Sequence, residues 1–182
     1  MVDVTAITAI AVAGLVGLGA PAIAARFQRI RESERFEEER RARDIAELRA
    51  RLEDVAGAFD QAARSASILL RSFLEQGVRY DGLAQLLDGA YADLQAARLA
   101  ISRLGLWLPI EAGPRRAATD GVAAMERAVH DIAAARLFGD EPPDEIKERM
   151  TADGETWGEE GLHFLDEARA LAGPVSIERA LA

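Results

Sequence analysis

The sequence predicts an all-α protein: an N-terminal transmembrane helix continuous with a charged stalk, then an antiparallel coiled-coil hairpin extended to a four-helix bundle. One observation is composition. Of the 182 residues 49% are hydrophobic, chiefly Ala and Leu, and nearly all basic residues are Arg. These are strong helix formers. The other is spacing, because apolar residues recur every three or four positions and no alternating, strand-like pattern competes.

Charge and cysteine content exclude several kinds of function. The net charge of -9 argues against nucleic-acid binding, which needs a basic face. The absence of cysteine excludes disulfides, thiol catalysis and zinc-thiolate sites. The charge is also uneven, since residues 140–182 hold 12 acidic and 4 basic side chains, whereas residues 26–44 hold 6 acidic and 7 basic ones. The acidic C-terminal part is therefore expected to point away from an anionic membrane and to offer a face to a basic partner.

Residues 1–26 are predicted to form a transmembrane anchor. The 22 residues 4–25 carry no charge, and as a helix they would rise about 33 Å, enough to cross the hydrocarbon core of a bilayer. Arg26, Arg29 and Arg31 follow this segment and only Asp3 precedes it. The positive-inside rule then places the N-terminus outside and the C-terminal domain in the cytoplasm, at the inner (plasma) membrane. A soluble Ala-rich helix is the alternative. A cleaved signal peptide is disfavoured, because the residues before the apolar segment lack the basic region with which signal peptides begin.

Small residues within this segment suggest self-association. Ala9, Ala13 and Gly17 are spaced four residues apart, so they share one helix face on which two membrane helices could approach closely. We therefore expect contact with membrane lipid through residues 4–25, and a homo-oligomer either through these three residues or through the helical seams described next. Two thirds of residues 27–44 are charged, and this segment is predicted to form a solvated helical stalk.

Two tandem heptad seams predict a helical hairpin at the start of a cytoplasmic bundle spanning 45–173. Helices are expected at about 45–76 and 83–105, separated by a Gly-rich turn. A short connection between two such helices favours antiparallel packing within one chain, and a parallel dimer is the alternative. The first seam consists of Ile45, Leu48, Leu52, Val55, Phe59, Ala62, Ala66, Leu69 and Phe73, and the second of Leu83, Leu87, Ala90, Leu94, Ala97, Ile101 and Leu104.

Two further helices complete the predicted bundle, at about 114–137 and 144–172, and residues 174–182 form a tail. Pro114 suits a helix start, because its missing N–H would have no partner there. Glycines at 154, 158 and 161 are expected to weaken the last helix by about 1 kcal/mol each relative to Ala. The apolar faces are predicted to be Ala118, Val122, Met125, Val129 and Ile132 on the third helix, and Ile146, Met150, Trp157, Leu165, Ala168 and Leu171 on the fourth.

No residues are assigned to catalysis, cofactor binding or metal binding. Glu160 and His163 have the Glu-x-x-His spacing of di-iron helical bundles, but such a site needs a second copy of the motif. The other histidine, His130, has Arg127 three residues before it instead. The serines lie in helical context without a nucleophile elbow, and no phosphate-binding loop is present. We therefore predict a protein that is not an enzyme and holds no cofactor.

The layout resembles uncharacterised actinobacterial single-pass membrane-anchored helical proteins. The resemblance rests on the apolar opening with GLVGLGAP at 14–21, the Arg/Glu stalk, and the Ala/Leu/Arg helices ending in FLDEARALAG at 164–173. It covers most of the chain through composition and layout, without a sharp motif. It implies a small anchored helical protein and carries over no active-site residues.

The predicted function is a non-enzymatic, membrane-tethered interaction or scaffold protein that self-associates or holds an unknown protein partner at the inner membrane. Restricting a partner to the membrane surface raises its effective concentration there. One alternative is a small membrane-active oligomerising protein of phage or toxin type, similar to a holin. A second alternative is a soluble helical-bundle ligand-binding protein, which would need a pocket with converging polar residues.

Overall fold

The fold is all-α over the residues that the computed structural model describes, which are 4–139 and 141–172, with side chains described for 28–139 and 141–171. Four helices and no strand occur in these ranges, which confirms the all-α part of the prediction. The helices are α1 (Val4–Gln76), α2 (Leu83–Leu104), α3 (Gly113–Phe138) and α4 (Asp144–Ala172). The chain divides into two compact units, residues 1–46 and residues 47–182.

The first unit consists of helical backbone from residue 4 onward. From residue 28 its side chains are almost all exposed and interact mainly within the helix. Arg35 Nε lies 3.4 Å from Glu39 Oε1, and Gln28 Nε2 donates to Glu32 Oε1 over 3.2 Å. Exposed pairs of this kind stabilise a helix by a few tenths of a kcal/mol each.

The predicted membrane anchor gains no support from the structure. In the part of the chain whose side chains are described, no helix is long and apolar enough to cross a membrane. The expected anchor at 4–25, together with the small-residue face of Ala9, Ala13 and Gly17, lies outside those residues. The same is true of the tail at 174–182.

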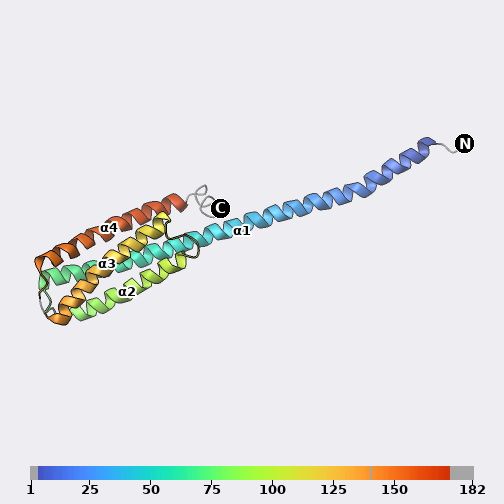
Figure 1. Cartoon of the computed structure of the whole chain (residues 1–182). Helices are drawn as coiled ribbons and strands as arrows, with labels where there is room; N and C mark the ends of the chain where they lie inside the picture. The colour runs from blue at the N-terminus through green and yellow to red at the C-terminus, as the bar shows by residue number, and fades with distance from the viewer. Residues whose placement is uncertain (1–3, 140, 173–182) are drawn as a thin grey trace. The chain divides into compact units, whose positions relative to one another are not determined.

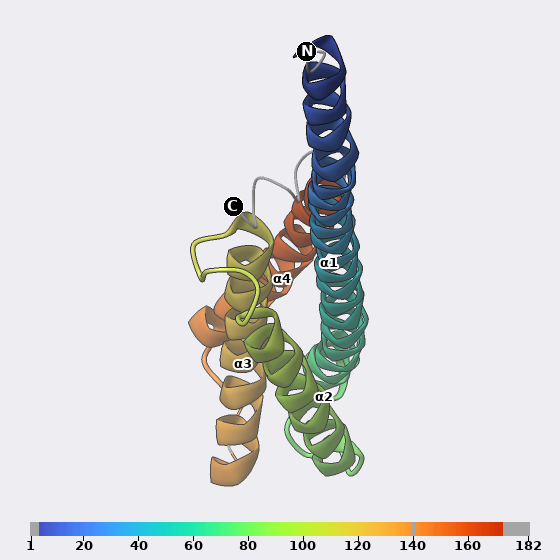
Figure 2. The same ribbon diagram turned by 90° about the vertical axis from the view of Figure 1, so that its right-hand side faces the viewer.

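The second unit is a helical bundle whose successive helices run in opposite directions (Figure 1). Two views at right angles show α2, α3 and α4 beside residues 47–76 of α1 (Figure 1, Figure 2). From Leu48 onward both predicted seams face the interior of this unit, whereas Ile45, the first residue predicted for the seam, belongs to the first unit and is only half-buried. Every predicted position from Leu48 to Phe73 and from Leu83 to Leu104 is buried, as are the five apolar residues predicted on α3.

Polar contacts fix the register of α1 against α2. Asp93 of α2 accepts hydrogen bonds from Ser65 Oγ at 2.5 Å and Gln61 Nε2 at 3.2 Å, both from α1. Because these bonds join the two helices within one chain, the seam packs as an intramolecular hairpin. Arg98 of α2 pairs in turn with Glu126 of α3.

The two loops at one end of the bundle are joined by a single carboxylate. Helix α1 ends at Gln76, and the next residue, Gly77, has a φ of +77°, which suits glycine because it has no Cβ. The next amide, of Val78, donates to Glu141 Oε1 in the α3–α4 loop over 3.2 Å. Lys147 Nζ lies 3.4 Å from the other oxygen of Glu141. The Glu141 carboxylate therefore accepts the hydrogen bond of the Val78 N–H, which lies just beyond the helix.

The predicted face of α4 is partly wrong. Met150 and Trp157 are buried as expected, but Leu165 is 38% exposed, and the core position beside it is taken by Phe164, which is 1% exposed. Phe164 stacks on Phe59 of α1 with ring centroids 6.5 Å apart. An aromatic pair buries more apolar surface than a leucine at the same site, and this contact between helices is not visible in the periodicity of α4 alone.

Candidate functional site

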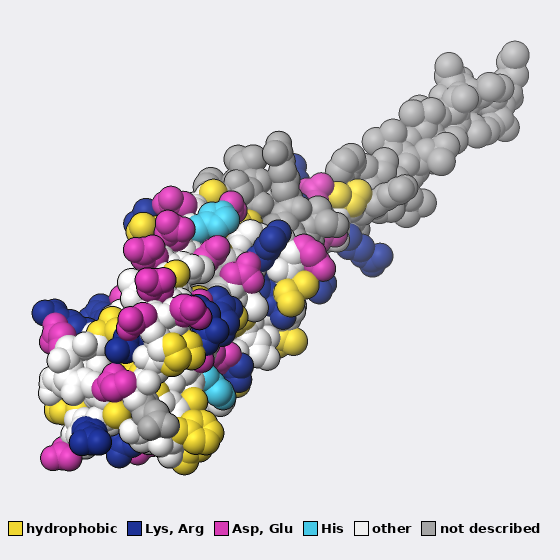
Figure 3. Space-filling model, turned by 60° about the vertical axis from the view of Figure 1, so that its left-hand side comes forward, with side chains coloured by type: hydrophobic (Ala, Val, Ile, Leu, Met, Phe, Trp, Pro, Cys, Tyr) yellow, Lys and Arg dark blue, Asp and Glu magenta, His cyan; other side chains and the backbone are white. Residues whose placement is uncertain are grey.

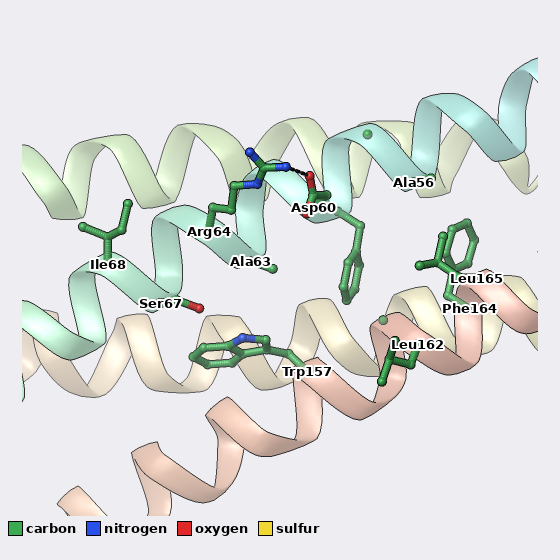
Figure 4. A pocket seen from close by; sticks show the side chains of 14 residues that line it. Ala56, Asp60, Ala63, Arg64, Ser67, Ile68, Trp157, Leu162, Phe164 and Leu165 are labelled. Atoms are coloured by element: carbon green, nitrogen blue, oxygen red, sulfur yellow. Dashed lines mark hydrogen bonds and ion pairs between the residues drawn. The ribbon is translucent and has the colours of Figure 1, made fainter.

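An apolar groove of about 820 Å³ lies between α1 and α4. On α1 it extends from Ala56 to Ile68, and on α4 from Trp157 to Leu165 (Figure 4). Both helices belong to the second unit and run antiparallel along the groove. The volume lies within the range of small-molecule and peptide pockets.

Buried aromatic rings form the floor of the groove. Phe59, Trp157 and Phe164 all line it, and their exposed fractions are only 6%, 5% and 1%. All three rings pack into the core, so the floor is already formed before anything binds. A preformed apolar floor reduces the entropy that an occupant must overcome.

Missing side chains account for the hollow above this floor. A Cβ added to Gly57 of α1 or Gly158 of α4 would meet no atom within 4 Å. By contrast, a Cβ on Gly161 would lie 2.8 Å from the Phe59 ring, so that glycine is needed for packing. Glycine inside a helix costs about 1 kcal/mol relative to Ala. At Gly57 and Gly158 no contact within the described part of the chain offsets this cost.

The lips of the groove expose large apolar side chains. Ile68 on α1 is 56% exposed, and Leu162 on α4 is 67% exposed. The polar side chains that line the groove are Asp60, Arg64 and Ser67, all from α1, and Asp60 and Arg64 pair with each other (Figure 4). Exposed apolar lips above an apolar floor are typical of a surface that docks another apolar surface.

A second hollow, of about 210 Å³, extends the groove toward the C-terminal end of α4. The two hollows share Ala56, Phe164 and Leu165, and the smaller one continues past Leu52 to Ala168. The apolar trough therefore follows most of the α1–α4 contact. Its elongated form suits an extended or helical segment better than a compact ligand.

A charged cluster between α3 and α4 is the other candidate. Arg127 donates from Nε and Nη2 to Asp153 Oδ1 over 3.1 and 2.6 Å, and Arg149 donates in the same way to Asp131 Oδ2 over 3.2 and 2.6 Å. The hydrogen bond with Asp131 raises the pKa of Arg149. A shallow hollow of about 520 Å³ beside the cluster includes His130. Both guanidinium groups already hold carboxylates, so we interpret the cluster as a clamp between two helices.

Glu160 and His163, which have metal-ligand spacing, do not form a metal site. His163 Nδ1 lies 3.6 Å from Glu160 Oε2, its Nε2 lies 3.5 Å from Glu167 Oε1, and the ring is largely exposed. Within the described ranges no group of three or more His, Asp or Glu side chains could hold a metal ion. Glu167 has a structural role instead, because a Cβ on Gly113 would lie 2.6 Å from its Oε2. The carboxylate stands at the N-terminus of α3, where no side chain caps the helix and negative charge is favourable.

The groove was not predicted from the sequence, and comparison with known proteins does not identify it either. The chain matches no protein-family model, no curated protein and no solved structure. The available signal was Gly57 and Gly158, two glycines at exposed positions inside helices. Periodicity identifies apolar faces, but it does not show that two glycines about 100 residues apart in the sequence line the same groove.

Proposed function

We propose that this chain is a non-enzymatic, membrane-tethered helical scaffold that holds a cytoplasmic protein partner at the inner membrane, with a helical segment of the partner seated in the α1–α4 groove. The observation that carries the docking role is the open apolar groove between α1 and α4. An amphipathic helix laid into such a groove would bury the exposed Ile68 and Leu162 together with its own apolar face.

The tethering part of the proposal rests on the sequence. Residues 4–25 are uncharged and are followed by three closely spaced arginines, which favours a single pass with the bundle in the cytoplasm. A partner held at the membrane diffuses in two dimensions, which raises its effective concentration toward other membrane proteins. Small-residue contacts through Ala9, Ala13 and Gly17 would bring two such scaffolds together.

Fractionation tests the tether. The full-length chain should sediment with membranes, resist high salt and alkaline carbonate, and be released by detergent, whereas a chain that begins at Arg26 should remain in the supernatant. Full-length protein that stays in the supernatant without detergent would overturn the membrane assignment. Because binding in the groove does not enter this measurement, the two parts of the proposal are tested separately.

Photo-crosslinking tests the docking. A photoreactive phenylalanine analogue at Leu162 should give a discrete protein adduct in cells, and mass spectrometry would identify the partner. The matched control places the same analogue at Gly89 of α2, which also has open space around it. Filling the groove with Gly158→Leu should abolish the adduct at Leu162. Adducts of equal yield from both positions would show that the groove is not the docking surface.

The groove volume also supports a second function, the binding of an apolar small molecule. About 820 Å³ would hold a drug-sized ligand between aromatic side chains. A lipid-like compound that co-purifies with the wild-type chain and is lost from Gly158→Leu would favour this function over a protein partner.

A further inference from the structure

One exposed face of α4, beside the groove, carries a row of acidic side chains. Glu148, Glu155, Glu159 and Asp166 are separated by seven, four and seven residues, so they share one helix face, and all four are exposed. We refer to them as the acidic stripe. In the space-filling view, acidic side chains gather along one side of the bundle with hydrophobic ones between them (Figure 3).

Two members of the acidic stripe, Glu159 and Asp166, lie beside the groove. Leu162 lies three residues after Glu159 and four before Asp166, and these spacings place side chains next to one another on a helix surface. Leu162 also lines the groove and is 67% exposed. A segment that covers Leu162 must therefore pass within reach of these carboxylates.

The opposite lip carries no compensating positive charge. On α1, Arg64 pairs with Asp60, and Arg71 Nε donates to Glu75 Oε1 over 2.8 Å. Both of these arginines are thus neutralised by a carboxylate of their own helix. The α1 lip is balanced, whereas the α4 lip has an excess of negative charge.

The stripe also lacks partners of its own. Among the described residues, Glu148, Glu155 and Glu159 form no ion pair, and Asp166 has only Arg169, with Arg169 Nη1 3.4 Å from its Oδ1. Glu155 and Glu159 are four residues apart, a spacing at which like charges destabilise a helix. A positively charged neighbour relieves this repulsion, and a neutral one does not.

The groove has the length of a short helix. Ala56 and Ile68 are twelve residues apart, which corresponds to about 18 Å or three helical turns. A helix of that length presents apolar anchors at positions i, i+3 or i+4, and i+7. Its flanks then face α1 on one side and the acidic stripe on the other.

We infer that the groove takes an amphipathic helix that carries Lys or Arg along one flank, with this basic flank lying over the acidic stripe of α4. The inference rests on the proposed docking function and adds the chemistry of the partner. The apolar floor supplies affinity, and the stripe selects both the charge and the orientation of the helix. Complementary charge also speeds encounter and makes association dependent on salt.

Two synthetic peptides test this inference. Both are dansyl-labelled 14-residue helices with the same Leu face, one with Lys along one flank and the other with Glu at the same positions. The full-length protein is placed in phosphatidylcholine nanodiscs, with empty nanodiscs as the blank. Trp107→Phe leaves Trp157, in the floor of the groove, as the fluorescence donor to the dansyl group.

The basic peptide should bind about tenfold more tightly than the acidic one at low salt, as expected for a few exposed ion pairs. Glu155→Gln with Glu159→Gln should remove most of this preference. The control pair Asp88→Asn with Glu111→Gln changes net charge equally at exposed sites outside the groove and should retain the preference. Gly158→Leu should abolish binding of both peptides.

Other outcomes overturn the inference in distinguishable ways. Equal binding of the two peptides, unchanged by Glu155→Gln with Glu159→Gln, would reject the basic partner and leave the docking function standing. Binding that survives Gly158→Leu would place the peptide elsewhere. Binding that requires removal of residues 174–182, or that weakens as protein concentration rises, would show that the chain's own tail or a second copy fills the groove. If neither peptide binds, the docking function fails as well.

Discussion

Two glycines of α4, three residues apart, should respond in opposite directions to the same Gly→Ala substitution. At Gly158 the new methyl group meets no atom within 4 Å, so the full helix-propensity gain of about 1 kcal/mol should appear as added stability. At Gly161 the same gain applies, but the Cβ would lie 2.8 Å from the Phe59 ring. The two variants therefore gain the same helix propensity and differ only in how the new methyl group packs.

The Phe59 ring cannot move aside easily. A Cβ on Gly121 of α3 would lie 2.7 Å from it, and Phe164 stacks on it. Over-packing a filled core costs about 1–3 kcal/mol, so Gly161→Ala should be less stable than Gly158→Ala by this amount. At about 2 kcal/mol, the melting temperatures of the two variants would differ by about 4–8 °C.

Thermal unfolding of the full-length variants, followed by circular dichroism at 222 nm, measures this difference. Combining Gly161→Ala with Phe59→Leu is the control, because removal of the ring should relieve the clash and leave a positive coupling energy between the two sites. If Gly161→Ala stabilises the chain as much as Gly158→Ala does, Phe59 does not lie against α4 and the reasoning about the floor of the groove is refuted.

Three further predictions concern the rest of the bundle. Arg127→Met should lower the free energy of unfolding by about 2 kcal/mol in urea titrations, because the buried Asp153 loses the hydrogen bonds that Arg127 donates and keeps only the longer-range attraction of Arg149; a loss below about 1 kcal/mol, as expected for an exposed pair, would contradict this. Burial raises the pKa of Tyr91 above its ordinary value, so absorbance at 295 nm, with the other tyrosine replaced by Phe, should titrate above pH 10 in the folded chain. Since the folded state favours neutral Tyr91, its stabilising contribution is complete below pH 10 and is lost as pH rises through the folded pKa; a midpoint at or below 10 would be inconsistent with burial. Glu141→Ala should cost about 1–2 kcal/mol by removing the acceptor for the Val78 amide, and unchanged protection of that amide in hydrogen exchange would argue against the bond.

The helices were predictable because their signals are local. The first two seams follow a heptad spacing without interruption, and each of their positions from Leu48 onward is buried. Helix ends were predictable for the same reason, since Gly77 and Gly139 both adopt positive φ at the ends of helices. Within α4 the periodic signal was weaker, and Leu165 was placed in the core in place of Phe164.

The groove depends on contacts that are distant in the sequence. The glycines of α4 were interpreted only as weakening the helix, yet they have different roles. Gly161 admits the Phe59 ring, whereas Gly158 leaves open space above it. The distinction depends on which residue of α1 lies opposite each glycine, and this is set by the packing of the whole bundle.

Phe59 belongs both to the core and to the floor of the groove, and this dual position has a thermodynamic consequence. Anything that binds the groove contacts a ring that also holds α3 and α4 in place. Binding and folding are then linked equilibria, so an occupant at 100 times its dissociation constant should stabilise the folded chain by about 2.7 kcal/mol. By the same linkage, substitutions at Gly121 that displace the ring should weaken binding from a position the occupant never touches.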